Sequence, residues 1–307
     1  MISGYVKDKR FKVLNKPLTK KIPKKLVWVD ILSPTKEELR KVSSTFNIEY
    51  SDLWLAMDES ERPRIESEKG YSFIIFNIPL YKRHVYTATL GIYIKGNTVI
   101  TIHRNQLKSL TELKGRILKE TLLDSASLVH MILLGVVKNF DTSLDKIEDF
   151  IDIIETDVLK KVEKDYTDIV FPIKRTLIYF RKAIKYNTEV LKSLRHGAIF
   201  KTQGDVFEDL YEDARQLIDE ETISRERITE IVNTNYNTLS NELNKVMKSF
   251  TVIATLILLP TFITGLYGMN FQIMPELNWE YGYLFALGVM FFSVVSMLLF
   301  FKKKKWL

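Results

Sequence analysis

The residues of this chain best suited to chemistry share one face of a helix near the C-terminal end. They recur at alternating steps of three and four, which keeps side chains on a single helical face. The face is uncharged and small, polar or flexible, so it can line a path for a hydrated ion. Close helix packing in a membrane is the alternative explanation for its small residues. The positions are Asn237, Ser240, Asn244, Met247, Thr251, Ala254, Leu258, Thr261 and Gly265.

This helix is expected to end at Tyr267-Gly268-Met269-Asn270. Glycine lets the backbone turn there. A ring of Asn270 amides from several chains would offer neutral oxygens that accept hydrogen bonds from the waters of a hydrated cation. A carboxylate ring would instead hold a divalent ion and slow its exit. Taken alone, the tripeptide is also an ordinary helix C-terminus with a capping asparagine.

Two apolar runs predict membrane spans. Phe250 to Asn270 is uncharged, and Tyr281 to Phe301 carries no ionisable group except tyrosine. A bilayer core of ~30 Å needs ~20 mostly apolar residues, so both runs are long enough.

Charges next to these runs predict the orientation of the chain. Lys302 to Lys305 follow the second run, whereas the loop 271–280 has Glu276 and Glu280 but no Lys or Arg. Lysines beside a span stay on the cytoplasmic side. We therefore expect a multi-pass protein of the cell membrane with both termini in the cytoplasm, which agrees with the lack of a signal peptide before the lysine-rich start.

Residues 1–120 read as a cytoplasmic α/β domain. Val27 to Leu32 and Tyr71 to Ile78 have strand composition, and His84 to Ile102, broken at Gly96-Asn97, predicts a hairpin. Ser33-Pro34, followed by acidic residues, predicts a helix start with Ser33 as the cap and Pro34 as the first helical residue.

Residues 121–204 predict a helical hairpin joined near Lys164-Asp165-Tyr166. Acidic residues flank the apolar seam of the first helix, and basic residues flank the apolar seam of the second, which favours antiparallel pairing of the two helices. Solvated charged faces explain most of these charged residues equally well. The first seam comprises Val137, Phe140, Leu144, Ile147, Ile151, Ile154 and Val158, and the second comprises Ile173, Leu177, Phe180, Ile184, Leu191 and Leu194.

A single long helix is predicted over residues 205–268. No glycine or proline occurs from Asp205 to Leu259, so we expect a stalk of ~60 residues, ~90 Å at 1.5 Å per residue. It continues into the first span at about 250–267. The loop 268–280, the second span 281–301 and the basic tail 302–307 complete the chain. The predicted fold class is an α+β cytoplasmic domain with a long helical stalk and two transmembrane helices.

Composition argues against two other classes of protein. The formal charge is +7, but the lysines cluster between residues 7 and 25 and beside the spans, without the basic stripe of a nucleic-acid binder. The chain has no cysteine, no glycine-rich phosphate loop and no HExxH motif, and its four histidines, His84, His103, His130 and His196, lack ligand spacing. We therefore expect neither nucleic-acid binding nor an enzyme.

Two spans cannot enclose a water-filled path, so a pore requires several chains. Helices ~10 Å wide in a ring leave a gap of ~4 Å for four, ~7 Å for five and ~10 Å for six. A hexahydrated Mg²⁺ is ~7 Å across and dehydrates reluctantly, so five chains would suit that ion. The same estimate leaves sodium or a larger solute open.

The order of long helix, span, Gly268-Met269-Asn270, short loop with Met274-Pro275-Glu276-Leu277 and Trp279, second span and lysine-rich end resembles the CorA family of Mg²⁺ transporters. The match is specific over residues 237–307. The resemblance implies a funnel-shaped homopentamer in membrane lipid, with the first spans lining the pore. It also implies transport of Mg²⁺, often with Co²⁺ or Ni²⁺, down the electrochemical gradient without nucleotide.

The resemblance also implies particular site residues. Gly268, Met269 and Asn270 carry the signature of the selectivity loop. The pore positions that the resemblance implies are Asn244, Met247, Leu258, Thr261 and Gly265, with Phe250 or Thr251 at the cytoplasmic constriction; the residue spacing adds Thr251 and Ala254 to the predicted lining.

Regulation by cytoplasmic Mg²⁺ is a further implication of the family. Asp209 fits the long-helix position of an intersubunit sensor, with Glu208 beside it. The acidic pair expected before Arg62-Pro63 falls instead on Trp54-Leu55. Asp52 and Asp58, three residues either side of Leu55, share its helical face and are the expected substitutes; a solvated acidic surface is the alternative. The expected ligands of the regulatory Mg²⁺ are therefore Asp52, Asp58, Glu208 and Asp209.

Two other functions stay open at this point. A related branch transports zinc or another divalent ion but tends to replace the methionine of the tripeptide, so Met269 favours Mg²⁺. A membrane-tethered helical interaction protein would explain the apolar seams. It would not explain the uncharged face or the tripeptide loop.

Overall fold

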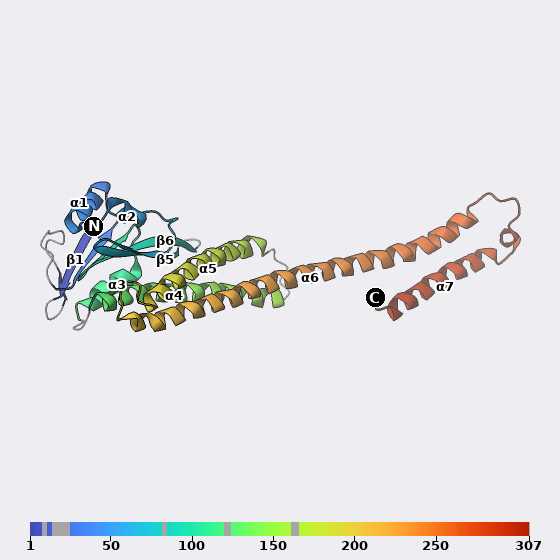
Figure 1. Cartoon of the computed structure of the whole chain (residues 1–307). Helices are drawn as coiled ribbons and strands as arrows, with labels where there is room; N and C mark the ends of the chain where they lie inside the picture. The colour runs from blue at the N-terminus through green and yellow to red at the C-terminus, as the bar shows by residue number, and fades with distance from the viewer. Residues whose placement is uncertain (8–10, 14–24, 82–84, 120–123, 161–165, 307) are drawn as a thin grey trace. The chain divides into compact units, whose positions relative to one another are not determined.

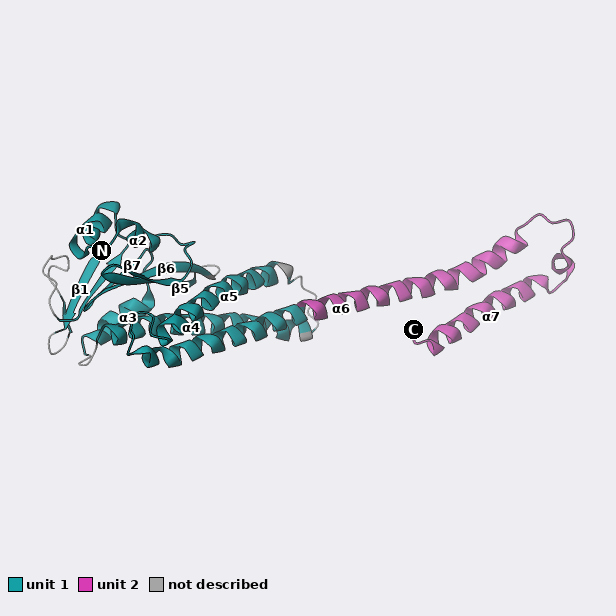
Figure 2. Cartoon of the chain, viewed as in Figure 1, with its two compact units in different colours: residues 1–231 teal, residues 232–307 magenta. Residues whose placement is uncertain are grey.

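The computed structural model describes residues 1–7, 11–13, 25–81, 85–119, 124–160 and 166–306 (Figure 1). The chain divides into unit 1, Met1–Ile231, and unit 2, Val232–Leu307 (Figure 2). The predicted helical hairpin, residues 121–204, belongs to unit 1 together with the β-sheet. Several predicted features lie outside the described residues, namely His84, the Lys164-Asp165 junction and the lysines Lys9, Lys16, Lys20, Lys21 and Lys24.

Unit 1 is built on a mixed sheet of the order β2-β1-β3-β7-β6-β5-β4. β3 and β7 pair in parallel, and the other described neighbours pair antiparallel. Gly96, at φ 57°, turns β6 into β7, which confirms the predicted hairpin. The strands are β1 Ile2–Lys7, β2 Phe11–Val13, β3 Val27–Leu32, β4 Arg64–Glu68, β5 Tyr71–Tyr81, β6 Val85–Lys95 and β7 Thr98–His103.

Helices cover both faces of this sheet (Figure 1). α1 (Lys36–Phe46) and α2 (Tyr50–Leu55) bury Leu39, Val42 and Leu53 against β3, β5 and β7. On the other face lie α3 (Lys108–Ile117), α4 (Ser125–Leu159) and α5 (Thr167–Arg195). The side-chain amide of Asn187 on α5 bonds both backbone groups of Asn77, so it completes β5 where β4 has ended.

The predicted start of α1 is wrong by two residues. Thr35 is the N-cap, and its hydroxyl accepts from the backbone N–H of Glu38 while the Glu38 carboxylate accepts from the Thr35 N–H. This reciprocal capping box satisfies two N–H groups that a cap at Ser33 would leave open. Ser33 instead adopts a left-handed conformation at φ 47°.

The seam predicted for α4 is buried at every position, and Phe140 meets Phe180 of α5 edge to face at 5.1 Å between ring centroids. The charged faces of α4 and α5 were predicted to pair with each other, but the structure gives them another role. Among the described residues, their ion pairs run to α6 (Glu208–Tyr267). Arg227 of α6 bonds Asp152 of α4, and Arg181 of α5 bonds Glu221 of α6, each at 2.6 Å.

α6 confirms the prediction of one long helix, since it contains 60 residues. A 3₁₀ turn, η1 (Gly204–Phe207), precedes it. Beyond α6 the chain forms a second 3₁₀ turn, η2 (Pro275–Asn278), and then α7 (Gly282–Lys303).

A buried charge network joins the sheet to α3. The carboxylate of Asp30 accepts from Thr101 Oγ1 at 2.5 Å, contacts His103 Nε2 at 3.0 Å and pairs with Lys114 Nζ at 2.6 Å. Burial alone raises the pKa of Asp30. The hydrogen bond and charge of His103, with hydrogen bonds from Lys114 and Thr101, outweigh burial and lower this pKa below its ordinary value.

We expect Asp30→Ala to lower the free energy of unfolding by about 3–5 kcal/mol, because it leaves Lys114 and His103 without their anion. Asp58→Ala, at an exposed aspartate, is the control and should change this free energy by less than 1 kcal/mol. Because the folded-state pKa of Asp30 is lowered, its stabilisation is present above the ordinary pKa of 3.8 and is lost as the pH falls through the folded value. Urea unfolding measured between pH 7 and pH 3 checks both effects; equal losses in the two variants would contradict them.

Candidate functional site

Unit 2 contains the apolar helices that the sequence predicts. The α6 helix and α7 are each long and apolar enough to cross a membrane, with mean hydropathy of 1.9 and 2.5 over their most apolar windows. Only 6% of the residues in either window are buried. These surfaces therefore need lipid or other protein around them.

The seven predicted pore positions are all exposed, including Met247 at 64% and Leu258 at 66%. The less exposed residues of the span centre on Val252, which is only 3% exposed. At 100° per residue, the centre of this covered face lies roughly 150° from the centre of the predicted pore face. The neighbouring apolar stripe, Leu239 to Phe250, is equally exposed. The covered residues of the span are Val252, Thr255, Leu256, Leu259, Pro260, Ile263 and Tyr267.

Threonine hydroxyls on the predicted pore face bond to the helix backbone. Thr251 Oγ1 donates to Met247 O and Thr261 Oγ1 donates to Ile257 O, both at 2.8 Å. A hydroxyl has one proton and two lone pairs, so each oxygen can still accept a hydrogen bond. Water molecules around a cation point their protons outward and are suitable donors.

Gly268 follows the last residue of α6. Its N–H donates to Thr264 O at 2.9 Å, and a Cβ added here would lie 3.2 Å from that carbonyl. Little room is left for a larger residue at this turn. Met269 and Asn270, which follow it, are exposed.

The loop closes against the start of α7. A Cβ on Gly282 would lie 1.9 Å from Glu276 O, so this position requires glycine. Trp279 packs against Tyr281 and Phe285. These contacts connect the loop that carries Asn270 to the second span.

Asp209 lies in the first turn of α6 and is exposed. Its negative charge acts on His130 of α4, whose pKa is lowered by burial and raised by Asp209, with burial the larger effect. Glu208 is already paired with Arg195 of α5. Asp209 is therefore the more available ligand of the two, and sequence reasoning missed both Arg195 and His130.

Asp52 and Asp58 do not share a helical face as predicted, because α2 ends at Leu55. Asp58 lies in the following turn, where it accepts hydrogen bonds from the backbone N–H and hydroxyl of Ser60. Asp52 accepts a hydrogen bond from Tyr71, and burial together with this bond raises the pKa of Tyr71 to about 12. Two of the expected ligands are thus already hydrogen-bonded.

One chain does not bring the four predicted regulatory carboxylates together. α2 lies on one face of the sheet, whereas the start of α6 is close to α4 on the other. Within the described ranges, no group of three or more His, Asp or Glu could hold a metal ion. A cation site at Asp209 would need a second chain.

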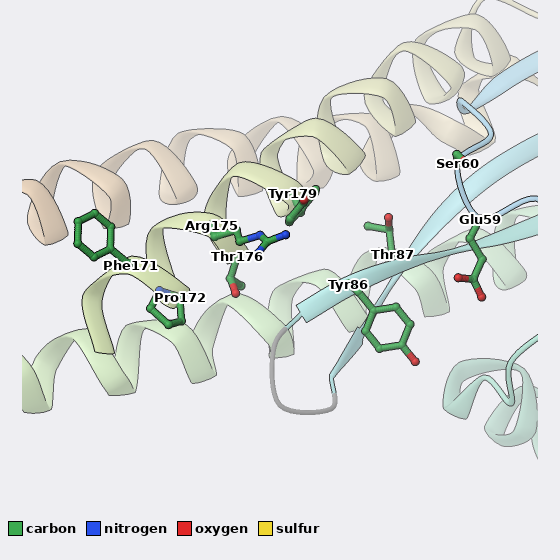
Figure 3. A pocket seen from close by; sticks show the side chains of 9 residues that line it. All are labelled: Glu59, Ser60, Tyr86, Thr87, Phe171, Pro172, Arg175, Thr176 and Tyr179. Atoms are coloured by element: carbon green, nitrogen blue, oxygen red, sulfur yellow. The ribbon is translucent and has the colours of Figure 1, made fainter. Parts of the chain in front are cut away.

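A pocket of about 700 Å³ separates α5 from the edge of β6 in unit 1 (Figure 3). Its walls include Phe171, Tyr179 and Tyr86, and the guanidinium of Arg175 lies 5.8 Å from the ring centroid of Tyr179. Of the described lining residues, Arg175 is the one cation and Glu59 the one carboxylate. The pocket therefore has no strong preference for an ion of either sign.

Comparison with known proteins places this geometry in a family. The model of the family described as "CorA-like Mg2+ transporter protein" matches residues 23–303. The cobalt/magnesium transport protein CorA of Methanocaldococcus jannaschii is 31% identical over 92% of this chain and 92% of its own length. That of Thermotoga maritima is 30% identical over 91% of this chain and 83% of its own length.

Solved structures agree with the sequence comparison. The complete structure of the CorA magnesium transporter from Methanocaldococcus jannaschii superposes with a TM-score of 0.90 at 28% identity, covering 100% of this chain and 99% of that one. The full-length CmaX protein, at 16% identity and a TM-score of 0.79, shares the fold.

Proposed function

The chain belongs to the family of CorA-like Mg²⁺ transporter proteins, a family of ion transporters, and from this membership we infer that it carries Mg²⁺ across a membrane. Two curated relatives are named as cobalt/magnesium transport proteins, so we extend the proposal to Co²⁺, and by chemical similarity to Ni²⁺. The single observation that carries the mechanism is the uncharged face of α6, which is exposed along the whole first span.

The ion path is proposed to run along this face in a homopentamer. The covered face of the span lies nearly opposite, which leaves Asn244, Thr251 and Thr261 available to a central axis. Five helices leave a gap of ~7 Å, which suits a hydrated Mg²⁺ better than the gap left by four or six. Met247 and Leu258 are the constrictions that lose water when the helices close.

Gly268, Met269 and Asn270 form the outer entrance in this proposal. The tight turn at Gly268 is followed by exposed Met269 and Asn270. Five Asn270 amide oxygens would accept hydrogen bonds from the waters of one hydrated ion. The lysines after α7 and the lack of Lys and Arg in the loop support an outer position for this ring and cytoplasmic termini.

Closure by cytoplasmic Mg²⁺ is proposed to involve Asp209 of one chain and the α2 side of its neighbour, at Asp52 or Asp58, with Glu208 in support. Carboxylates from adjacent chains repel each other when no ion is bound, and a divalent cation converts that repulsion into a bridge. The ion favours the closed state only through its higher affinity for that state. The exposed position of Asp209 supports this role.

We expect Asn270→Ala to lower Mg²⁺ uptake into proteoliposomes at least tenfold, because it removes the amide ring but little packing. Asn278→Ala is the matched control, since it removes an exposed asparagine from the same loop. It should retain uptake within twofold. Wild-type uptake by the Asn270 variant, with wild-type block by cobalt(III) hexaammine, would contradict the proposed entrance.

The pore face can be mapped by single cysteines, since the chain has none of its own. Cysteines at Asn244, Thr251 and Leu258 should react with a charged methanethiosulfonate at least ten times faster than cysteines at Leu243 and Phe250, and modification should block uptake. The measurement is made in reconstituted vesicles. Equal rates on the two stripes would show that the face is assigned wrongly.

Mg²⁺ at millimolar concentration should protect the wild-type protein from limited proteolysis, because bridged chains open less often. Asp209→Ala should lose most of this protection. Asp213→Ala, one turn along the same exposed helix, should keep it. Protection that survives joint replacement of Asp209, Asp52 and Asp58 would exclude this site as the sensor.

A further inference from the structure

A second pocket in unit 1 has a chemistry that cation transport does not require. It has a volume of about 500 Å³ and lies between α3 and α4, with Pro79 and Leu80 of β5 at its edge. We call it the α3–α4 pocket. The residues that matter here are Lys108, Ser109 and Arg116 of α3 and Gly135, Lys138 and Lys146 of α4.

The charge of this pocket is strongly positive. Among the described lining residues, the cations are Lys108, Arg116, Lys138 and Lys146, and the carboxylate is Glu112. Lys108 and Glu112 form an exposed pair at 3.7 Å, which neutralises little. In the parts of the chain that the structure describes, Arg116 and Lys138 form no ion pair.

Asp141, one turn along α4 from Lys138, is an acid that interacts with one of these cations. Burial, followed by the charges of Asp145, Glu220 and Asp213, raises the pKa of Asp141, whereas the charge of Lys138 lowers it. Its attraction for Lys138 is thus shared with an acidic surface. The pocket itself keeps an excess of positive charge and favours an anion.

A buried hydroxyl without a partner lines the same pocket. Ser109 is 7% exposed, and its Oγ has no hydrogen-bond partner among the described residues. Gly135 allows this approach, because a Cβ there would lie 2.9 Å from Ser109 Cβ. A buried donor without a partner is unfavourable, and a bound acceptor would remove that cost.

Ser109 is the second residue of α3, so the start of this helix also borders the pocket. The N-cap residue, Leu107, supplies no side-chain hydrogen bond, and the first turn contains no acid. Free N–H groups and the positive end of the helix dipole attract a phosphoryl group. Three independent features therefore converge on one anion: the cations, the hydroxyl and the helix start.

We propose that the α3–α4 pocket binds a small soluble phosphate monoester. The phosphoryl oxygens accept from Ser109 Oγ and pair with Arg116 and Lys138, which can present several donors to them. The organic part packs on Leu113, Met131 and Leu134, which also line the pocket. The described lining residues all belong to unit 1, whereas the apolar runs 250–267 and 282–301 lie in unit 2, and we therefore assign a soluble ester rather than a lipid.

The test uses the full-length protein in detergent with EDTA, so that Mg²⁺ binds neither probe nor protein. Adenosine 5′-monophosphate is titrated calorimetrically, with inorganic phosphate as the second probe and sodium chloride at matched ionic strength as the baseline. Adenosine 5′-monophosphate should bind at least tenfold more tightly than inorganic phosphate, because only the ester fills the apolar part. Equal affinities, or no heat beyond that of chloride, would overturn the proposal.

The variants locate the site. Arg116→Gln with Lys138→Gln should weaken binding of adenosine 5′-monophosphate at least tenfold, and Ser109→Ala at least threefold. Arg175→Gln, which removes the cation of the other pocket, should bind within twofold of the wild type. Affinity in the double variant within twofold of the wild type would overturn the assignment. If the double variant does not fold, each single variant should show a loss of at least threefold, and wild-type affinity in both would overturn it equally.

Discussion

The absence of water from the bilayer core is the constraint on which the rest of this structure depends. A backbone N–H or C=O without a partner costs several kcal/mol there, so a spanning segment must satisfy its own groups. The uninterrupted helix α6 does this, and even Thr251, Thr255 and Thr261 turn their hydroxyls toward backbone carbonyls. Pro260 is the exception within the span, because it removes the N–H that would bond the carbonyl of Leu256.

The same constraint explains why one chain is incomplete. Burial in unit 1 comes from a sheet with helices on both faces, whereas the most apolar windows of unit 2 bury only 6% of their residues. Lipid covers an apolar surface without loss, but it offers no hydrogen-bond donor to the lone pairs that remain on the hydroxyl oxygens of Thr251 and Thr261 on the opposite side. A polar face on a spanning helix therefore needs water or another chain beside it, and a ring of copies supplies both.

Much of unit 1 follows from sequence periodicity. The seam from Val137 to Val158 could be predicted because apolar residues recur with the helical period, and the long helix α6 could be predicted because neither glycine nor proline occurs from Asp205 to Leu259. The start of α1 was not predicted correctly, since Ser33 and Thr35 are both good caps and only the reciprocal bonds with Glu38 decide between them. Contacts distant in sequence, such as Arg195 with Glu208, leave no local pattern.

The candidate pore face could also be predicted from the helical period, but the structure of a single chain does not identify it uniquely. Leu243 and Phe250 are as exposed as Met247 and Leu258, so exposure alone does not separate the two stripes. What distinguishes them is chemistry: one stripe offers oxygens and the other only carbon. The α2 side of the proposed regulatory site was harder to predict, because Asp58 lies in a turn beyond α2 and accepts hydrogen bonds from Ser60.

Membrane electrostatics accounts for the division between neutral and acidic residues in the proposed transporter. A potential of 100 mV supplies ~2.3 kcal/mol per charge, hence ~4.6 kcal/mol to a divalent ion, so downhill flux needs no nucleotide. Fast flux then requires weak binding along the path, which the amide of Asn270 and the hydroxyls of Thr251 and Thr261 would provide in the proposed pore. A sensor needs the opposite property, because it must hold its ion long enough to bias a conformation. Carboxylates such as Asp209 would give that affinity in the proposed sensor, and their position outside the span would keep tight binding from obstructing the path.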